Sequence, residues 1–294
     1  MLITSFDVVL ASQHLTGGIP SELTAVVRLE VMYLDRNSLS GSIPMGVGTL
    51  TQLKKMNIFD NMLTGSIPTS IGNIFTLQEI NLFNNYLEHS VPTTLSNCTA
   101  LGLLRLQHNL LTGPLQGIFH MDMIHIEHVD LSDNKFSGSI PKGIFELPIV
   151  SSVALSRNCF EGSLPAAMCD ARNVSVLSMD GLGAAKACKG SVELPLSGVT
   201  LFNTLEGSIP SCVWVLPLLQ VLHLTGNGLT GSVHISETET LGPVLTTISL
   251  GMYSQKGRSR SGRCCVPTVY SRRAYVFDIW LYFLLFSYAT MLSL

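Results

Sequence analysis

The chain has 294 residues and a formal net charge of −3, with 17 basic and 20 acidic side chains, so no charge excess points to nucleic acid as a partner. Charged residues make up only 13% of the chain and hydrophobic residues 46%, which fits a protein that places many positions in a core. The seven cysteines are too few for a disulfide scaffold, and their odd number leaves at least one thiol without a partner inside the chain.

The N-terminal segment, MLITSFDVVLASQ at 1–13, does not resemble a secretory signal. It has no basic residue, Asp7 interrupts its apolar stretch, and Val8 and Leu10 already occupy strand positions of the repeat that follows. We expect the sequence to begin inside a longer array. A cytosolic protein that starts at Met1 is the alternative.

A phrase of the form Leu-Thr/Ser-Gly-x-Ile-Pro recurs from residue 15 onward. Its prolines at 20, 44, 68 and 92 are spaced 24 residues apart. Clear copies are LTGGIP (15–20), LSGSIP (39–44), LTGSIP (63–68), FSGSIP (136–141) and LEGSIP (205–210). A fixed step of this length predicts a solenoid, in which each repeat forms one coil that stacks on its neighbours.

Each unit begins with a short strand in which apolar and polar residues alternate, as at Met32 and Leu34, because successive side chains of a strand point to opposite faces. Seven residues before each proline position stands an amide, which can satisfy backbone groups of the turn that leaves the strand. We expect these amides to form a buried structural ladder made of Asn37, Asn61, Asn85, Asn109, Asn134, Asn158, Asn203 and Asn227.

The unit L-x-x-L-x-L-x-x-N-x-L-x-G-x-I-P resembles the plant-type extracellular leucine-rich repeat (LRR) family, and residues 29–50, LEVMYLDRNSLSGSIPMGVGTL, match that repeat almost position by position. The resemblance implies an α/β-type LRR solenoid: a curved right-handed coil with a parallel β-sheet on its concave face and irregular or 3-10 turns on its convex face. We expect an array of about seven repeats at 1–165, a diverged repeat or island at 166–197, and further repeats at 198–250.

The island lacks the Asn-x-Leu-x-Gly-x-Ile-Pro phrase, and Cys169 and Cys188 bracket its centre. A bridge between these two disulfide candidates would close a loop of about 20 residues and stabilise the protein by roughly 3 kcal/mol. Interruptions of such arrays can carry ligand contacts in the plant receptors that the chain resembles. A diverged repeat that is held by a disulfide is the simpler alternative.

The chain changes character after residue 250. Residues 251–273 form a basic linker, and 274–294 are apolar apart from Asp278. Because about 20 apolar residues span a bilayer core, the last segment is predicted as a transmembrane helix. A tail of strands that covers the last coil, or a misread exon, is the alternative. Basic residues before a span favour cytosolic repeats, whereas the family resemblance favours repeats outside the cell.

No catalytic, phosphate-binding or cofactor motif occurs in the sequence, so we expect neither an enzyme nor a bound cofactor. The glycine-rich stretches belong to the repeat turns. His120, His125 and His128 with Glu127 are residue types that can bind metal, but their spacing fits neither an HExxH motif nor a zinc finger. We expect a polar edge there and no metal.

The exposed positions of the stacked strands should form the functional surface, because a solenoid presents one extended concave face. Phe59 and Phe83 occupy the same column in adjacent coils, about 5 Å apart by strand spacing. Exposed aromatic residues beside charged ones are typical of binding hot spots. The predicted partner-binding residues are Tyr33, Asp35, Arg36, Phe59, Asp60, Phe83, Arg105, His108 and Asp130.

These observations favour a non-catalytic recognition protein of the receptor-like LRR type, or a fragment of one, that acts in signalling or defence. Its partner would be a peptide, protein or glycan, with a co-receptor as a further partner. N-glycosylation sequons at Asn97 and Asn173 suggest a secretory history, with the repeats outside the cell and a membrane tail. The alternatives are a secreted inhibitor of a cell-wall hydrolase and a cytosolic scaffold that the tail anchors.

Overall fold

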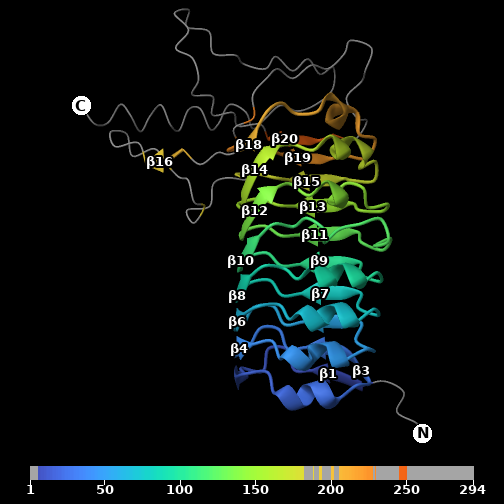
Figure 1. The fold of residues 1–294 in the computed structure, drawn as a ribbon, viewed down its shortest axis with the longest axis vertical. Coiled ribbons are helices and arrows are strands. Elements are labelled where there is room, and N and C mark those ends of the chain that lie inside the picture. Colours follow the sequence, from blue (N-terminus) through green and yellow to red (C-terminus); the bar gives the residue numbers. More distant parts are fainter. Residues whose placement is uncertain are drawn as a thin grey trace, which may run out of the picture.

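The computed structural model describes residues 6–181, 188, 192–193, 200–201, 205–227, 229 and 245–249. Within these ranges the chain winds into stacked coils that build two long parallel sheets (Figure 1). A typical coil runs from a strand of the first sheet to a strand of the second, and a short 3-10 turn then leads back to the first. This arrangement of parallel strands and 3-10 turns confirms the predicted LRR solenoid.

The ten-stranded sheet is the one that the alternating strand cores predict. Its register pairs equivalent repeat positions: Met32 with Met56, Met56 with Ile80, and Ile80 with Leu104. These central residues are buried, so the constant step between repeats keeps one face of the sheet in the core. The strands in sheet order are β1 (Phe6–Val9), β3 (Leu29–Tyr33), β5 (Lys55–Asn57), β7 (Glu79–Asn81), β9 (Leu103–Arg105), β11 (His128–Asp130), β13 (Ser152–Ala154), β15 (Val176–Ser178), β19 (Val221–His223) and β20 (Thr247–Ser249).

A second, eight-stranded parallel sheet was not predicted from the sequence. It forms at the Leu-Thr/Ser-Gly phrase, where Leu39 and Leu63 are buried in the core. The glycine of the phrase has a φ of +74° at Gly41 and +75° at Gly65, a conformation that glycine adopts without strain. The strands in sheet order are β18 (Leu205–Glu206), β14 (Cys159–Ser163), β12 (Lys135–Ser139), β10 (Leu110–Gly113), β8 (Tyr86–His89), β6 (Met62–Gly65), β4 (Ser38–Ser42) and β2 (Thr16–Gly17).

A short 3-10 turn follows the proline of most repeats. Pro44, Pro68 and Pro92 have φ values of −58°, −63° and −67°, which the proline ring favours, and they keep the chain extended just before the turn. Apolar residues of the turns, such as Val47 and Ile71, are buried. The turns are η1 (Ser21–Ala25), η2 (Met45–Thr49), η3 (Thr69–Asn73), η4 (Thr93–Asn97), η5 (Lys142–Ile144), η6 (Ala166–Asp170) and η7 (Ser211–Val215).

Leucine, isoleucine and valine fill most of the interior of the coils. Leu53, Leu77 and Leu101 occupy equivalent positions in successive repeats, and all three are completely buried. Burial of one such side chain contributes about 1.5–3 kcal/mol. Because each coil contacts only its neighbours, the stability of the array is approximately a sum of these contributions coil by coil.

The buried amide ladder that the sequence indicates is present. The Nδ2 group of Asn61 donates to the carbonyl oxygens of Ile58 at 3.1 Å and of Leu34, one coil earlier, at 3.0 Å. Its Oδ1 accepts the backbone N–H of Leu39 at 3.0 Å, so one side chain satisfies backbone groups of two coils. Asn203 lies outside the described residues. Comparable bonds to the carbonyl oxygens of two coils are made by Asn37, Asn85, Asn109, Asn134, Asn158 and Asn227.

The array continues beyond residue 165, into the segment 166–197 that was predicted to be a diverged repeat or island. Residues 166–170 form η6, and β15 pairs in register with both β13 and β19. Leu177 thus lies beside Leu222, although the sequence between them is longer than one repeat. The extra residues form an insertion inside one coil, between β15 and β18, which contains an antiparallel pair of β16 (Val192–Glu193) and β17 (Thr200–Leu201). Met168 and Leu177 still supply the buried apolar groups that a coil needs.

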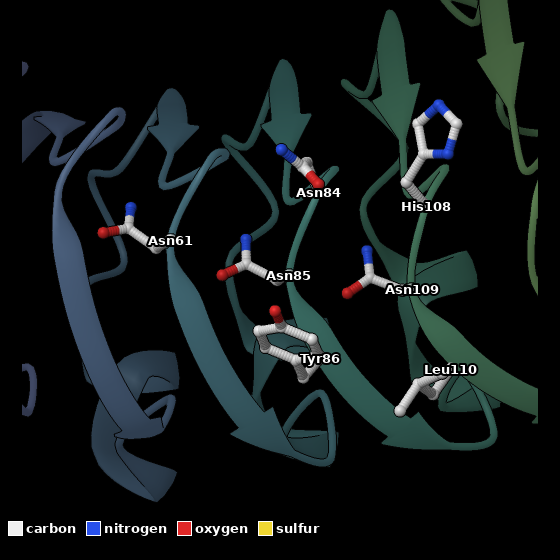
Figure 2. A pocket seen from close by; sticks show the side chains of 7 residues that line it. All are labelled: Asn61, Asn84, Asn85, Tyr86, His108, Asn109 and Leu110. Carbon is white, nitrogen blue, oxygen red and sulfur yellow. The ribbon is translucent and has the colours of Figure 1, made fainter.

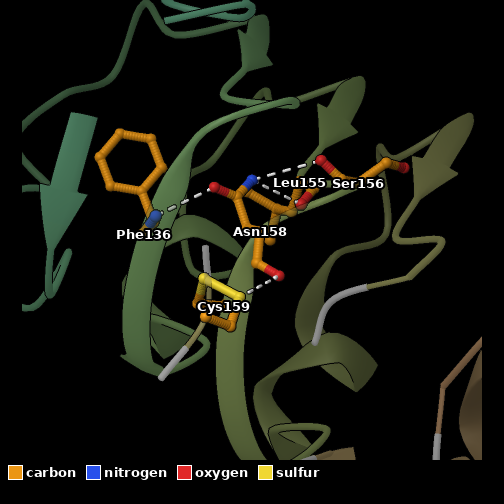
Figure 3. The surroundings of a disulfide bond; sticks show 6 residues. Phe136, Leu155, Ser156, Asn158 and Cys159 are labelled. Carbon is orange, nitrogen blue, oxygen red and sulfur yellow. Dashed lines mark hydrogen bonds between the residues drawn. A yellow bond between two sulfur atoms is a disulfide. The ribbon is translucent and has the colours of Figure 1, made fainter. Parts of the chain in front are cut away.

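The predicted Cys169–Cys188 bridge is wrong. Cys188 is bonded to Cys159 on β14, and Cys169 is bonded to Cys212, with Cα atoms 5.3 and 5.4 Å apart respectively. Cys169 on η6 and Cys212 on η7 meet because successive coils stack, although 43 residues separate them. Figure 3 shows that Cys159 directly follows Asn158, whose Nδ2 donates to the carbonyl oxygen of Leu155 at 2.8 Å.

The free cysteine within the described residues is Cys98, which is buried in the core. Burial raises the pKa of its thiol to about 12, because the thiolate would lose its hydration there. Cys264 and Cys265 lie outside the described residues.

The predicted basic linker (251–273) and transmembrane segment (274–294) also lie outside the described residues. In the part of the chain that the structure does describe, no helix has the length and apolar character needed to cross a membrane. The C-terminal hydrophobic helix therefore stays a prediction.

Candidate functional site

The exposed side of the ten-stranded sheet, here called the sheet face, corresponds to the predicted concave surface. Most of the predicted partner-binding residues have solvent-accessible side chains on it. Asp35 is the exception, because it is only 7% exposed. The prediction that Asp35 is an available contact residue is therefore corrected. The exposed or partly exposed members are Tyr33, Arg36, Phe59, Asp60, Phe83, Arg105, His108 and Asp130.

Three of these side chains form a continuous stack. The rings of Phe59 and Phe83 lie 4.3 Å apart between centroids at an interplanar angle of 13°, and the Arg36 guanidinium carbon lies 5.4 Å from the Phe59 ring centroid. Aromatic pairs contribute about 0.5–1.5 kcal/mol beyond their buried area, and an exposed cation on a ring about 0.5–1 kcal/mol. The stack therefore presents an ordered apolar surface with a positive charge at one end.

The residue that precedes each ladder amide adopts a left-handed backbone. Its φ lies between 51° and 56° at Ser12, Arg36, Asp60, Asn84, His108, Asp133 and Arg157. Non-glycine residues rarely adopt this region, where the conformation costs roughly 1–2 kcal/mol, although Asn, Asp and His are enriched there. This backbone conformation was not predicted from the sequence. The recurrence of Asp, Asn or His directly before the ladder asparagine is the signal that could have revealed it.

Side chains of this left-handed column pair from coil to coil. Asn84 donates through Nδ2 to Asp60 Oδ1 at 2.7 Å, and Arg36 Nε lies 3.9 Å from Asp60 Oδ2. Farther along, Arg157 donates to both carboxylate oxygens of Asp133, and His108 Nδ1 lies 3.4 Å from Asp133 Oδ2. No such bond joins Asn84 to His108 within the described residues, so the chain of pairs is interrupted at that point.

The C-terminal end of the sheet face is acidic. The hydrogen bond to Asp133 raises the pKa of Arg157, and the carboxylates of Asp180 and Asp130 act in the same direction. Asp180 accepts the backbone N–H and the hydroxyl of Thr225 at 2.7 and 2.6 Å. Three carboxylates therefore surround one guanidinium in this region.

The basic residues beside the aromatic stack are largely compensated. Lys54 Nζ lies 2.5 Å from Glu30 Oε2, and Lys55 Nζ lies 2.9 Å from Glu79 Oε1. The hydrogen bond to Glu79 raises the pKa of Lys55. Partly exposed pairs of this kind contribute at most about 1 kcal/mol. The exposed arginines of this part of the sheet face are Arg36, over the Phe59 ring, and Arg105, beside Asn81 of the preceding coil.

A pocket of about 320 Å³ lies where the chain leaves the ten-stranded sheet and enters the eight-stranded one (Figure 2). It coincides with the interruption between Asn84 and His108 in the left-handed column. Tyr86 and Leu110, the first residues of β8 and β10, form another part of its wall. Three ladder amides complete the lining: Asn61, Asn85 and Asn109.

The other candidate positions show no catalytic or metal-binding arrangement in the described ranges. Groups of three or more His, Cys, Asp or Glu that could hold a metal ion are absent there. The two sequon asparagines are both exposed. They differ in that the Asn173 Nδ2 donates to the carbonyl oxygen of Pro148 at 2.5 Å.

The chain is similar to known leucine-rich repeat proteins in sequence and in fold. A family model described as Leucine Rich Repeat matches residues 28–50, 52–74, 76–98 and 125–147. The Arabidopsis receptor kinase HAESA, whose LRR ectodomain was solved with an N-terminally extended IDA peptide hormone ligand, is 30% identical over 84% of this chain and 37% of that chain, with a TM-score of 0.68. The plant peptide hormone receptor RGFR1, solved with RGF2, is 27% identical over 81% of this chain and 34% of that chain, with a TM-score of 0.67.

A TDR receptor structure is similar to the same degree, at 26% identity and a TM-score of 0.67 over 81% of this chain and 37% of that chain. The present chain thus spans about a third of the length of these receptor chains. A plant ice-binding protein, at 22% identity, shares the fold, with a TM-score of 0.61 over 83% of this chain and 72% of that chain. A comparison with curated protein sequences found no match.

Proposed function

Because the chain is a plant-type leucine-rich repeat protein, we propose that it is a non-catalytic recognition protein of the receptor-like type that binds a peptide or protein segment on the sheet face. The Arg36–Phe59–Phe83 stack carries this proposal. Partly exposed rings beside a cation gain free energy when a partner covers them, as hot-spot residues do. The peptide complexes of RGFR1 and HAESA support the same class of ligand.

Two regions of the sheet face, the aromatic stack and the carboxylates near Arg157, define the chemistry of the ligand. An apolar or aromatic side chain would cover the rings of Phe59 and Phe83, and a basic group would approach the carboxylates near Arg157. Phe83 and Asp133 lie two coils apart, which is roughly 10 Å at the spacing of neighbouring strands. An extended peptide advances about 3.3–3.6 Å per residue, so the apolar and basic residues of the ligand would be about three positions apart.

The same proposal places the repeats outside the cell, with the 274–294 segment as membrane anchor, a co-receptor as a further partner, and a role in signalling or defence. Two disulfides support this location, because such bonds form and persist in oxidising compartments. Similarity to a receptor ectodomain supports it as well. A hydrolase inhibitor and a cytosolic scaffold stay predictions from the sequence, as does a glycan on the sheet face.

A glycosidase experiment tests the location. Asn97 is the better acceptor of the two sequon residues, because the Asn173 amide is already engaged by Pro148. We expect the protein from its native membranes to shift in mobility on glycosidase treatment, and the shift to disappear largely in Asn97→Gln. Unglycosylated protein on the cytosolic side, by protease protection of intact vesicles, would contradict the proposed location.

Peptide selection on the full chain tests the function. A displayed library of random peptides is enriched on the wild type, and the affinities of the synthetic winners are measured for Phe59→Ser/Phe83→Ser and for Phe75→Ser. Phe75 is 61% exposed after η3, outside the sheet face, and serves as the matched control. We expect at least about thirtyfold weaker binding, or roughly 2 kcal/mol, for the double variant only.

Two results would overturn the assignment of the site. One is equal affinity of the wild type and the double variant for the selected peptides. The other is enrichment of peptides that contain no apolar residue. Thermal unfolding of all three proteins establishes that the substitutions leave the array folded.

A further inference from the structure

The pocket at the interruption of the left-handed column has free hydrogen-bonding groups that the fold does not use. In neighbouring coils the column residues pair with one another, at Asp60 with Asn84 and at Asp133 with His108. Between Asn84 and His108 the surface is hollowed instead. The pocket is therefore a local departure from the repeat and not a feature that every coil shares.

The free groups come from three side chains. Asn84 uses one N–H for Asp60, which leaves its carbonyl oxygen and its second N–H. His108 faces Asp133 through Nδ1, and in the tautomer that carries its proton on Nδ1 the Nε2 atom is an acceptor. Tyr86 is 54% exposed and contributes a hydroxyl and a ring face. Figure 2 shows Asn84 and His108 on one side of the row of ladder amides and Tyr86 on the other, with the Tyr86 hydroxyl turned toward that row.

The charges around the pocket restrict the ligand. The lining contains no lysine or arginine that could hold a carboxylate, phosphate or sulfate. The two nearest acids on the column, Asp60 and Asp133, already accept bonds from Asn84 and Arg157. An anion would find no lysine or arginine in the lining, and the two carboxylates would repel it at short range. A neutral ligand with several hydroxyl groups satisfies the acceptors without this cost.

We propose that this pocket binds a neutral sugar ring. Hydroxyl groups of the sugar would donate to Asn84 Oδ1 and His108 Nε2, and the apolar face of the ring would lie on Tyr86. A volume of about 320 Å³ falls at the lower end of the range for ligand sites, where one ring fits. The site is separate from the aromatic stack, so this inference does not depend on the peptide-binding proposal.

The test titrates the full chain with the methyl glycosides of glucose, galactose and mannose, observed by ligand saturation-transfer NMR. Methyl glucuronide serves as the anionic probe and methylguanidinium as the cationic one. We expect saturable binding of at least one neutral glycoside. Because Tyr86→Ala removes the ring contact and Asn84→Gly removes the hydrogen bond to the amide oxygen, we expect about tenfold weaker binding in each variant. Glycine suits the φ of 53° at position 84, so this variant removes the amide and keeps the backbone.

Met62→Ala is the matched control, since Met62 is exposed at the position equivalent to Tyr86 in the preceding coil and does not line the pocket. It should bind the glycoside as the wild type does, and so should Phe59→Ser/Phe83→Ser. Failure of all neutral glycosides to bind, affinity that is unchanged in Tyr86→Ala and Asn84→Gly, or tighter binding of either charged probe than of every neutral glycoside would each overturn the proposal.

Discussion

Two regions of the solenoid keep the same register by different means. Coils between residues 29 and 113 repeat every 24 residues, and each is joined to its neighbour by a buried asparagine. The coil that contains β15 carries an insertion, and two disulfides lie around it. In the first region the periodic burial of apolar groups is enough to keep the coils in register. In the second, covalent links hold together segments that the sequence separates.

A solenoid therefore tolerates an insertion if the residues on both sides of it still supply strand and core positions. Leu177 and Leu222 pair as if no insertion lay between them. Extra loop length adds little to the entropic cost of closure, about 0.6 kcal/mol for each doubling. The disulfides then restrict the unfolded chain where the repeat pattern is interrupted.

The largest expected effect comes from removing a disulfide beside the insertion. Cys169→Ser/Cys212→Ser should lose about 4 kcal/mol of unfolding free energy, because the bond spans 43 residues and closes a long loop in the unfolded chain. Cys159→Ser/Cys188→Ser, with a separation of 29 residues, should lose about 3.5 kcal/mol. Urea denaturation measures both, with the exposed Ser163→Ala as control. Unchanged stability of both variants would show that stacking alone holds this region.

Within the regular coils, the ladder amide is the critical group. Asn85→Ala should cost about 3 kcal/mol, because the backbone N–H of Leu63 and the carbonyl oxygen of Ile58 lose a buried partner. Asn73→Ala, at an exposed position of η3, should change stability by less than about 0.5 kcal/mol in the same denaturation experiment. Equal effects of the two substitutions would refute the structural role of the ladder.

Cysteines in the two regions should also respond differently to pH. The Cys98 thiol in the regular coils has its pKa raised from 9.0 to about 12 by burial. Below pH 9 both states are protonated; above it the unfolded state loses the proton first, so stability falls between pH 9 and 12. At pH 10 the loss is about 1.4 kcal/mol. Cys98→Ala should not show this loss of stability when urea unfolding is compared at pH 8 and pH 10. An identical pH dependence of stability in the wild type and the variant would contradict the prediction.

The smallest expected effect on stability comes from a buried acceptor in the regular coils that has no hydrogen-bond partner among the described residues. This acceptor is Gln107 Oε1. Gln107→Met keeps the volume and removes the unpaired acceptor, so we expect a gain of about 1 kcal/mol. Gln52→Met at an exposed position should be neutral. Thermal unfolding checks both, and a destabilised Gln107→Met would indicate that the glutamine has a partner in solution.

The sequence predicted the solenoid, the strand cores and the amide ladder because each depends on one residue type at a fixed step. It predicted the wrong cysteine pairing because closeness along the chain was used in place of closeness between stacked coils. The second sheet was missed since its strands are short and only one residue of a strand such as β6, Leu63, is buried.

For the candidate site, the column of Phe59 and Phe83 followed from the repeat step, and the structure adds their parallel stacking and the position of Arg36. The burial of Asp35 was not predictable from alternation, which placed this residue on the exposed face of the sheet. The left-handed column and the pocket beside Asn84 depend on backbone angles and on pairs between coils.

By itself the sequence determined the register of the coils, since a 24-residue step returns the same residue type to the same place in each turn. Tertiary structure decided which side chains meet across that step. These contacts join side chains that are about 5 Å apart in space but 24 or more residues apart in the chain. Examples are the bond between Asp60 and Asn84, the disulfide between Cys169 and Cys212, and the pocket between Asn84 and His108.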